Sequence, residues 1–381
     1  MNTTTLEDER GKAMATGPAK DLGLKIDANR LQFADVLRFF GAIAVVFQHT
    51  FELSGIKFLN DLTLLLGPGI FGVALFFFIS GFVIPFSVRR GIDLRDFAIR
   101  RIFRIYPLVI VAFLLWFVSA SLGIIHDDRL YQIDLPTFMA NIFFYHNFTG
   151  AISILGVTWT LSLEFLWYAM FAVTLVVFGK RTGFVMEIVP PLVIIVGMVA
   201  AILSGHRIPI GYFGLIYCAA IGYQAFLMFE GTLRPRRFWT SAIIMVVIMA
   251  IGNVVSYGYF HHERTTLAAS IVPWMLAPLV FFAAQIPSVR SLPVFRNRTL
   301  STLGAISFST YMLHPLALAF CKRFTSGGIW VACSILLALA MSFVGYRWVE
   351  RPGIELGRRL ARRFSTGKAT RDHSIILDPS G

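Results

Sequence analysis

The chain has 381 residues, of which 56% are apolar and only 14% are charged, whereas about a quarter of an ordinary soluble domain is charged. This composition excludes a plain water-soluble enzyme, a secreted disulfide scaffold and a disordered protein. Lys and Arg outnumber Asp and Glu by 34 to 21, which leaves a net charge of +13. Such an excess suits nucleic acid, a membrane surface or an anionic ligand, and the positions of the charges decide among them.

Ten apolar stretches run along the chain, each with roughly the 20 residues that a helix needs to cross a bilayer. The first is not a signal peptide, because a polar tail precedes it and further stretches follow. The sequence shows neither an internal repeat nor the alternation of an outer-membrane barrel. We therefore expect an all-α polytopic membrane protein with about ten transmembrane helices, at residues 35–54, 68–88, 104–123, 158–179, 186–204, 208–229, 239–258, 267–286, 301–321 and 328–348.

The basic residues outside these stretches predict the orientation. If the N-terminus is cytoplasmic, 26 of the 34 Lys and Arg residues face the cytoplasm and 6 face outward. Ten crossings with both termini cytoplasmic satisfy this distribution. The basic excess then belongs to the membrane face, so we expect no nucleic-acid partner.

The sequence divides into three parts. Residues 1–34 are polar and punctuated by Gly and Pro, which predicts a cytoplasmic tail that is largely disordered. Residues 35–352 contain the apolar stretches and form the transmembrane domain. Residues 353–381 form a basic cytoplasmic tail, which begins with a short helix that rests on anionic headgroups through Arg358, Arg359, Arg362 and Arg363.

The first apolar stretch carries two ionisable residues, which are costly in a bilayer and are therefore candidates for function. Arg38 and His49 are 11 positions apart, which places them on one helix face, about 16 Å apart along the axis. Arg38 lies near the cytoplasmic boundary and His49 in the outer half. The structural alternatives are an arginine that anchors the helix at the surface and a histidine that bonds a neighbouring helix.

Three arginines mark the point where the third stretch leaves the cytoplasm. Arg100, Arg101 and Arg104 fall within about one helical turn. Their guanidinium groups form a compact receptor for phosphates, which arginine binds through paired hydrogen bonds. A cluster that only sets the membrane orientation is the alternative.

The fourth stretch opens with hydroxyl residues, followed by an acid. Glu164 lies one or two turns inside, after Thr158, Thr160 and Ser162. It either pairs with a buried cation or keeps its proton, because burial disfavours the charged form.

The ninth stretch carries Tyr311 and His314 after two serines. His314 lies at a depth similar to that of His49, which predicts a cavity that the two histidines share. A histidine that only packs between helices, before the kink expected at Pro315, is the alternative.

Six motifs together resemble the acyltransferase 3 family, the integral-membrane O-acyltransferases that modify bacterial surface and exported polysaccharides. They follow the family's order and spacing between about Asp35 and Pro352, with one departure, Phe308 in place of a tyrosine. Each motif is weak alone, whereas six in register are specific. The six motifs correspond to these residues of the chain: the pair Arg38 and His49; the two segments 69–73 and 77–82; the cluster Arg100, Arg101 and Arg104; residues 158–164; residues 306–314; and residues 350–352.

The resemblance implies an O-acyltransferase of the bacterial inner membrane. It would move an acyl group, acetyl above all, from cytoplasmic acyl-CoA to a hydroxyl of a cell-surface or exported glycan or of a lipid-linked sugar. It implies acetyl-CoA as donor substrate, no permanently bound cofactor and no metal. The catalytic residue it names is His49. The donor-binding residues are Arg38, Arg100, Arg101 and Arg104, and the supporting candidates are Asp35, Trp159, Ser162, Glu164, Tyr311 and His314.

In this interpretation, neutral His49 accepts the proton of the acceptor hydroxyl as the hydroxyl attacks the thioester. The expected partners are acyl-CoA, the glycan acceptor, membrane lipids and the polysaccharide biosynthesis machinery. Direct transfer and a transient acyl-enzyme both stay open. So do two other functions: a proton-coupled secondary transporter of an anionic or sugar-like solute, which intramembrane charges suit, and a scaffold for a polysaccharide synthase.

Overall fold

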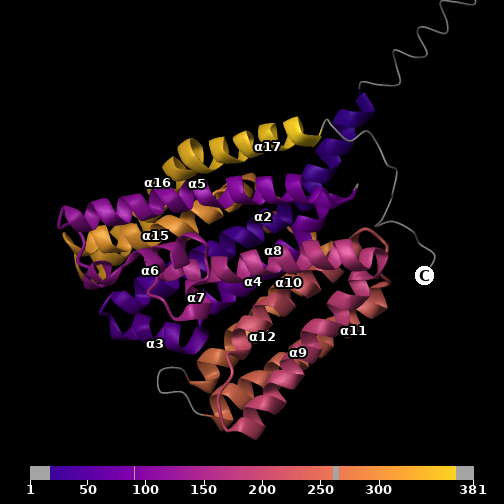
Figure 1. Cartoon of the computed structure of the whole chain (residues 1–381), viewed down its shortest axis with the longest axis horizontal. Coiled ribbons are helices and arrows are strands. Elements are labelled where there is room, and N and C mark those ends of the chain that lie inside the picture. Colours follow the sequence, from indigo (N-terminus) through magenta and orange to yellow (C-terminus); the bar gives the residue numbers. More distant parts are fainter. Residues whose placement is uncertain (1–17, 90, 261–265, 366–381) are drawn as a thin grey trace, which may run out of the picture.

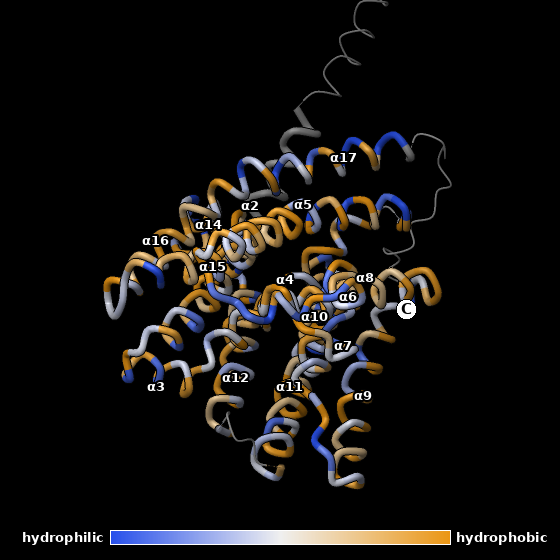
Figure 2. Tube along the Cα trace, turned by 60° about the vertical axis from the view of Figure 1, so that its left-hand side comes forward, coloured by the Kyte–Doolittle hydropathy of each residue, from blue (hydrophilic) through white to orange (hydrophobic). Residues whose placement is uncertain are grey.

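A computed structural model describes residues 18–89, 91–260 and 266–365, and within these ranges the chain is helical, with no β-strand. Figure 1 shows the helices gathered into one bundle, with α9, α11 and α12 extending away from the others at the lower right. Most of the chain is apolar along its helices, as Figure 2 shows in orange. The expected all-α polytopic membrane fold is confirmed.

Each of the ten predicted apolar stretches contains a helix. In chain order these helices are α2 (Pro18–Leu53), α4 (Pro68–Val83), α5 (Leu94–Ser121), α8 (Trp159–Phe178), α9 (Thr182–Ser204), α10 (Ile210–Phe229), α11 (Pro235–Asn253), α12 (Leu267–Ala283), α15 (Ser307–Lys322) and α16 (Gly327–Gly345). Shorter helices connect them, namely α3 (Lys57–Leu66), α6 (Leu135–Ile142), α7 (His146–Thr149), α13 (Pro287–Arg290) and α14 (Arg298–Ala305).

The number of crossings stays a prediction. Seven helical segments of the described chain are long and apolar enough to cross a bilayer, or eight if the bent pair α14 and α15 counts as one. One of the seven, Gly156–Ser204, contains both α8 and α9, which meet at a short 3-10 turn. α12 is a shorter apolar helix of 17 residues. The cytoplasmic location of both termini also stays a prediction.

The structure describes a part of both predicted tails. α2 begins at Pro18, inside the tail predicted over residues 1–34, while residues 1–17 and 366–381 lie outside the described ranges. The short helix predicted after residue 352 is present as α17 (Arg351–Ser365), which packs along α5. Its arginines are exposed, and Figure 2 shows its hydrophilic turns in blue.

The core forms around α4, which packs between α2 and α10. Glycines allow the backbones to come close on both sides. A Cβ atom on Gly72 would lie 2.3 Å from the carbonyl oxygen of Gly41 in α2, and one on Gly81 would lie 1.8 Å from that of Ala219 in α10. Membrane helices commonly use small residues to pack this closely.

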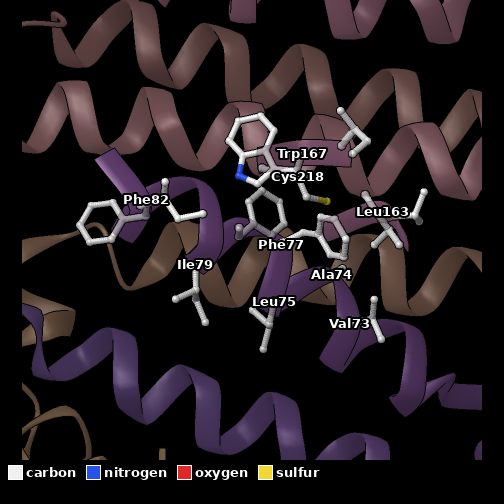
Figure 3. Packing of buried hydrophobic residues seen from close by; sticks show 14 of the residues in the cluster. Val73, Ala74, Leu75, Phe77, Ile79, Phe82, Leu163, Trp167 and Cys218 are labelled. Atoms are coloured by element: carbon white, nitrogen blue, oxygen red, sulfur yellow. The ribbon is translucent and has the colours of Figure 1, made fainter. Parts of the chain in front are cut away.

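Apolar side chains of α4, α8 and α10 fill the space between these helices. Phe77 of α4 lies beside Trp167 of α8 and Cys218 of α10, and all three are buried (Figure 3). Phe78 stacks on Phe281 of α12 with 4.6 Å between ring centroids. Because lipid tails are as apolar as these side chains, close packing holds the helices together here.

A bend of 65° separates α14 from α15. At the end of α14, a Cβ atom on Gly304 would lie 1.8 Å from the carbonyl oxygen of Asp35, so α14 ends against the backbone of α2. α15 starts at Ser307 and continues beside α2. The bend thereby brings the polar residues of α15 toward the helix face that carries Arg38 and His49.

Candidate active site

Helices α2, α4, α5, α8 and α15 line a cavity of about 470 Å³ inside the bundle. Arg38 lines it from α2, Arg101 and Arg104 from α5, Glu164 from α8 and Tyr311 from α15. We call it the arginine cavity. Residues that the sequence placed in four separate motifs therefore meet in one space. The further polar residues in its lining are Ser80, Ser87, Thr160, Tyr168 and Ser307.

The guanidinium groups of the arginine cavity have different partners. Arg38 donates a hydrogen bond to Asp35, one turn earlier in α2, at 2.8 Å. Arg101 donates to the hydroxyl of Ser87 at 3.3 Å and lies over the rings of Phe97 and Tyr168. Aromatic rings attract a cation without neutralising it. Arg101 therefore keeps a full charge that an anion in the cavity can use.

Two carboxylates balance the positive charge of this region. Glu164 accepts a hydrogen bond from the hydroxyl of Tyr168, one turn later in α8. Glu350 is fully buried, accepts a hydrogen bond from the hydroxyl of Ser309 at 2.7 Å, and interacts electrostatically with Arg104. A buried carboxylate needs a cation or donors nearby. For Glu350, the Ser309 hydroxyl supplies a donor and Arg104 a nearby positive charge.

Arg100 lies outside the arginine cavity, although it directly precedes Arg101. Its guanidinium donates two hydrogen bonds to Asp96, one turn earlier, at 2.7 and 2.9 Å. Successive residues of an α-helix point about 100° apart, so adjacent arginines face different surroundings. Of the four predicted donor-binding residues, the structure brings together Arg38, Arg101 and Arg104 and separates Arg100 from them.

A second cavity, of about 360 Å³, contains the two predicted histidines. The rings of His49 in α2 and His314 in α15 stack with 5.4 Å between centroids and 16° between planes. Trp159, Arg129 and Lys322 also line this space, which we call the histidine cavity. The two histidines thus share a cavity, as their similar depths predicted.

The hydrogen bonds of His314 define which of its nitrogens carries the proton. The side chain is fully buried, and Nδ1 lies 2.8 Å from the carbonyl oxygen of Tyr311 and 3.3 Å from that of Thr310. Carbonyl oxygens only accept, so Nδ1 must be the donor. Nε2 is then an acceptor in the neutral ring, and it has no hydrogen-bond partner among the described residues.

The segment between α5 and α6 holds Arg129 at the histidine cavity. The Arg129 guanidinium donates to both carboxylate oxygens of Asp127, at 2.7 and 2.8 Å, and the indole of Trp116 donates to the same group at 3.1 Å. Burial raises the pKa of Asp127, but the hydrogen bonds from Arg129 and Trp116 outweigh it and hold the pKa below its ordinary value. Asp127 therefore stays charged near neutral pH and keeps the guanidinium in place.

A single hydrogen-bonded wall separates the two cavities. Tyr311 and Thr160 line the arginine cavity, whereas Val157 lines the histidine cavity. The Tyr311 hydroxyl donates to the carbonyl oxygen of Val157 at 2.8 Å and lies 2.8 Å from the hydroxyl of Thr160. The Tyr311 and His314 ring centroids are 6.1 Å apart. Tyr311 therefore lies between the arginine cavity and the histidine cavity.

The remaining supporting candidates occupy the margins of the site. Trp159 lines the histidine cavity and stacks on Tyr212 of α10, with 5.6 Å between ring centroids. Ser162 is buried outside both cavities, and its hydroxyl has no hydrogen-bond partner in the described part of the chain. Asp35 forms a salt bridge with Arg38.

Sequence reasoning missed two residues that contact the candidates directly. Tyr168 follows Glu164 by four positions and donates a hydrogen bond to it. Glu52 follows His49 by three positions and lies beside it. Both spacings place side chains on one helix face, where they meet. This periodicity is the signal that would have found them.

A third cavity, of about 990 Å³, lies among loops that carry predicted cytoplasmic arginines. Phe229 lines this cavity and Phe86 lines the arginine cavity, and their ring centroids are 5.9 Å apart. The two aromatic rings therefore lie between the two spaces. We call it the basic cavity. Its arginines are Arg290, Arg296 and Arg298.

Comparison with known proteins extends this description. A family model described as an acyltransferase domain matches residues 31–347, which is most of the chain. The matched range includes every residue that lines the arginine and histidine cavities. No curated protein and no solved structure matches the chain.

Proposed function

The chain belongs to the acyltransferase 3 family, and from this premise we propose that it is a membrane-embedded O-acyltransferase that uses acetyl-CoA to acylate a hydroxyl group. The proposed acceptor is a cell-surface or exported glycan, or a lipid-linked sugar that becomes part of one. The proposed location is the bacterial inner membrane, with both termini in the cytoplasm.

One observation supports the proposal most directly: the arginine cavity and the paired imidazoles lie on opposite sides of the wall at Tyr311. An acyl-CoA molecule carries anionic phosphates, which suit guanidinium groups such as those of Arg101 and Arg104. Its thioester reacts with an alcohol when a base removes the alcohol's proton, and an imidazole suits that role near neutral pH. The cavities that hold the groups for both needs therefore meet at Tyr311.

The proposed reaction follows from these groups. The acceptor hydroxyl attacks the carbonyl carbon of the thioester, so that a carbon–oxygen bond forms and the carbon–sulfur bond breaks. His49 takes the hydroxyl proton, and CoA leaves as a thiolate that is then protonated. The unpartnered Nε2 of His314, held in the acceptor state by its Nδ1 bonds, is placed to accept a hydrogen bond from a sugar hydroxyl in the same cavity.

Tyr311 stands where donor and acceptor must meet in this scheme. Its hydroxyl donates a hydrogen bond to the carbonyl oxygen of Val157 and forms another with the hydroxyl of Thr160 at the wall. When the thioester arrives from the arginine cavity, a rotation of this ring opens the histidine cavity to it. Tyr311 thus keeps the histidine cavity closed toward the arginine cavity until the donor is bound.

The test is acyl transfer by the purified protein. Labelled acetyl-CoA is incubated with the protein and an extract of lipid-linked sugars, and labelled glycan is separated from CoA. We expect His49→Ala to lower the rate by about a hundredfold or more. His206→Ala serves as control, because His206 is exposed and outside both histidine-cavity and arginine-cavity linings.

Two results would contradict the proposal. Solute flux across proteoliposomes without consumption of the thioester would identify a transporter. Equal acyl content of the cellular glycans with and without this protein, measured by mass spectrometry, would exclude the proposed acceptor class.

A further inference from the structure

His49 has a carboxylate neighbour that the sequence motifs do not include. Glu52 lies one turn further along α2, and its Oε2 atom is 3.4 Å from Nδ1 of His49. The side chains are 42% and 37% exposed, respectively. A pair at this spacing on a solvated helix face contributes little by itself. The significance of this one depends on what holds the carboxylate.

The second carboxylate oxygen of Glu52 is held by Gln48, one turn earlier in α2, and Gln48 is in turn bonded by α4. Oε1 accepts a hydrogen bond from the side-chain amide of Gln48, and the amide oxygen of Gln48 accepts the backbone N–H of Gly69 at 3.1 Å. Gly69 lies in the first turn of α4, where backbone N–H groups lack intrahelical partners. A chain of contacts therefore runs from the start of α4 through Gln48 to Glu52 and on to His49.

Gly69 is suited to this arrangement because it has no side chain. A Cβ atom at this position would lie 2.9 Å from Cγ of Gln48. The close approach fixes the amide of Gln48, and with it the carboxylate. The carboxylate of Glu52 is therefore held in one position by Gln48 and does not rotate freely at the surface.

The rest of the histidine cavity constrains the other face of the imidazole. His314 stacks on the ring of His49, and its own Nδ1 is occupied by backbone carbonyls. The other charged side chains that line the cavity are Arg129, from the outer loop, and Lys322, from the end of α15. Glu52 is thus the carboxylate that lies next to Nδ1, with cations at the margin.

We propose that Glu52 is the positioning residue for His49. Its carboxylate accepts a hydrogen bond from the Nδ1–H group of the imidazole, which fixes the tautomer and the ring orientation and leaves Nε2 as the base that faces the acceptor hydroxyl. The proposal rests on the proposed function for its reaction, whereas the pair itself can be tested separately. An acid that orients a histidine in this way does not exchange a proton with substrate.

The first experiment measures acyl transfer with Glu52→Gln, which keeps the shape of the side chain and removes its charge. We expect kcat to fall by about tenfold or more, with the KM for acetyl-CoA and for the acceptor unchanged within about twofold. Glu52→Asp should recover part of kcat. Glu355→Gln is the matched control, because Glu355 pairs with Arg351 on α17 and lines neither cavity.

A double substitution distinguishes positioning from general stability. Gln48→Met should lower kcat in the same direction, and Gln48→Met combined with Glu52→Gln should be no slower than Glu52→Gln alone, because both act through one chain of contacts. Additive losses, or losses that follow the melting temperature, would overturn the proposal.

The second experiment reads the imidazole without any turnover. The purified full-length protein is treated with diethyl pyrocarbonate at pH 8, where an ordinary imidazole is neutral, and labelling of His49 is measured by mass spectrometry relative to His206. We expect Glu52→Gln to slow the labelling of His49 by about threefold, because the carboxylate makes Nε2 more nucleophilic. An unchanged rate would refute the pair. If the parent protein transfers no acyl group while the labelling responds as expected, the proposed function fails and the pair stands.

Discussion

At the scale of single residues, Arg100 and Arg101 show that a shift of one position along a helix changes the surroundings of a side chain completely. They are chemically identical and adjacent, and either one fits a phosphate-binding motif. In the folded chain Arg101 lies over two aromatic rings inside the arginine cavity, whereas Arg100 is bound to Asp96 outside it. A guanidinium that already pairs with a carboxylate is less available to an anionic ligand, which favours Arg101 over Arg100 as the anion-binding residue.

We therefore predict that Arg101→Ala weakens acyl-CoA binding by about tenfold or more, which corresponds to the loss of one charge-assisted hydrogen bond. Arg100→Ala should weaken it less, and neither should change acceptor binding to the same extent. Calorimetric titration with CoA in detergent measures the difference. Unchanged CoA affinity in Arg101→Ala would remove the arginine cavity from the donor site and direct attention to the basic cavity at Arg290, Arg296 and Arg298.

At the scale of helices, the site depends on how closely α4 fits between its neighbours. α4 holds residues of the arginine cavity on one face while its glycines touch α2 and α10. In α10, a Cβ atom on Gly222 would lie 2.1 Å from the carbonyl oxygen of Phe78. A backbone carbonyl has no room to rotate away, so any side chain here would push the helices apart.

We predict that Gly222→Ala lowers the free energy of unfolding by about 1–3 kcal/mol, the usual cost of overpacking a core. Thermal unfolding in detergent measures the change. Gly197→Ala is the matched control: this glycine also lies within a helix, α9, but a Cβ atom would meet no atom within 4 Å. There alanine should be neutral or stabilising, because glycine is a poor helix former. Equal effects at both positions would show that the contact between α4 and α10 is not close in solution.

At the scale of the whole molecule, the order of the cavities matches the proposed direction of transfer. The arginines of the basic and arginine cavities lie toward loops that carry most of the basic residues, and the histidine cavity adjoins the long segment between α5 and α8, which the sequence predicts to face outward. Acetyl-CoA is cytoplasmic, whereas the proposed glycan is exported, so donor and acceptor would approach the Tyr311 wall from opposite sides of the membrane.

We predict that cysteines introduced at two exposed loop positions react with a maleimide from opposite sides of the membrane. In a background with Cys333→Ser, a membrane-impermeant maleimide should label Asp128→Cys in intact cells and should label Ser291→Cys only after the membrane is opened. The two remaining native cysteines are buried. Labelling of both variants in intact cells, or the reverse pattern, would contradict the predicted orientation.

Hydropathy alone was sufficient for the helical membrane fold and for ten apolar stretches that are all helical. Charge spacing within single helices was sufficient to place Arg38 and His49 on one face. It did not predict contacts between helices, such as the hydrogen bonds that join Tyr311 to Val157 and to Thr160. Such contacts join residues more than 150 positions apart, and no periodicity within a helix encodes them.

The sequence alone was therefore sufficient to identify the ionisable residues of the candidate site. Burying an ionisable side chain is costly, so such residues are conspicuous within apolar segments. Tertiary structure alone decided which of these residues meet. The bend before α15 brings His314 onto His49, and the contact between α2 and the start of α4 holds Glu52 through Gln48. The direction of a side chain within a bundle depends on helix packing, which the order of residues along one helix does not specify.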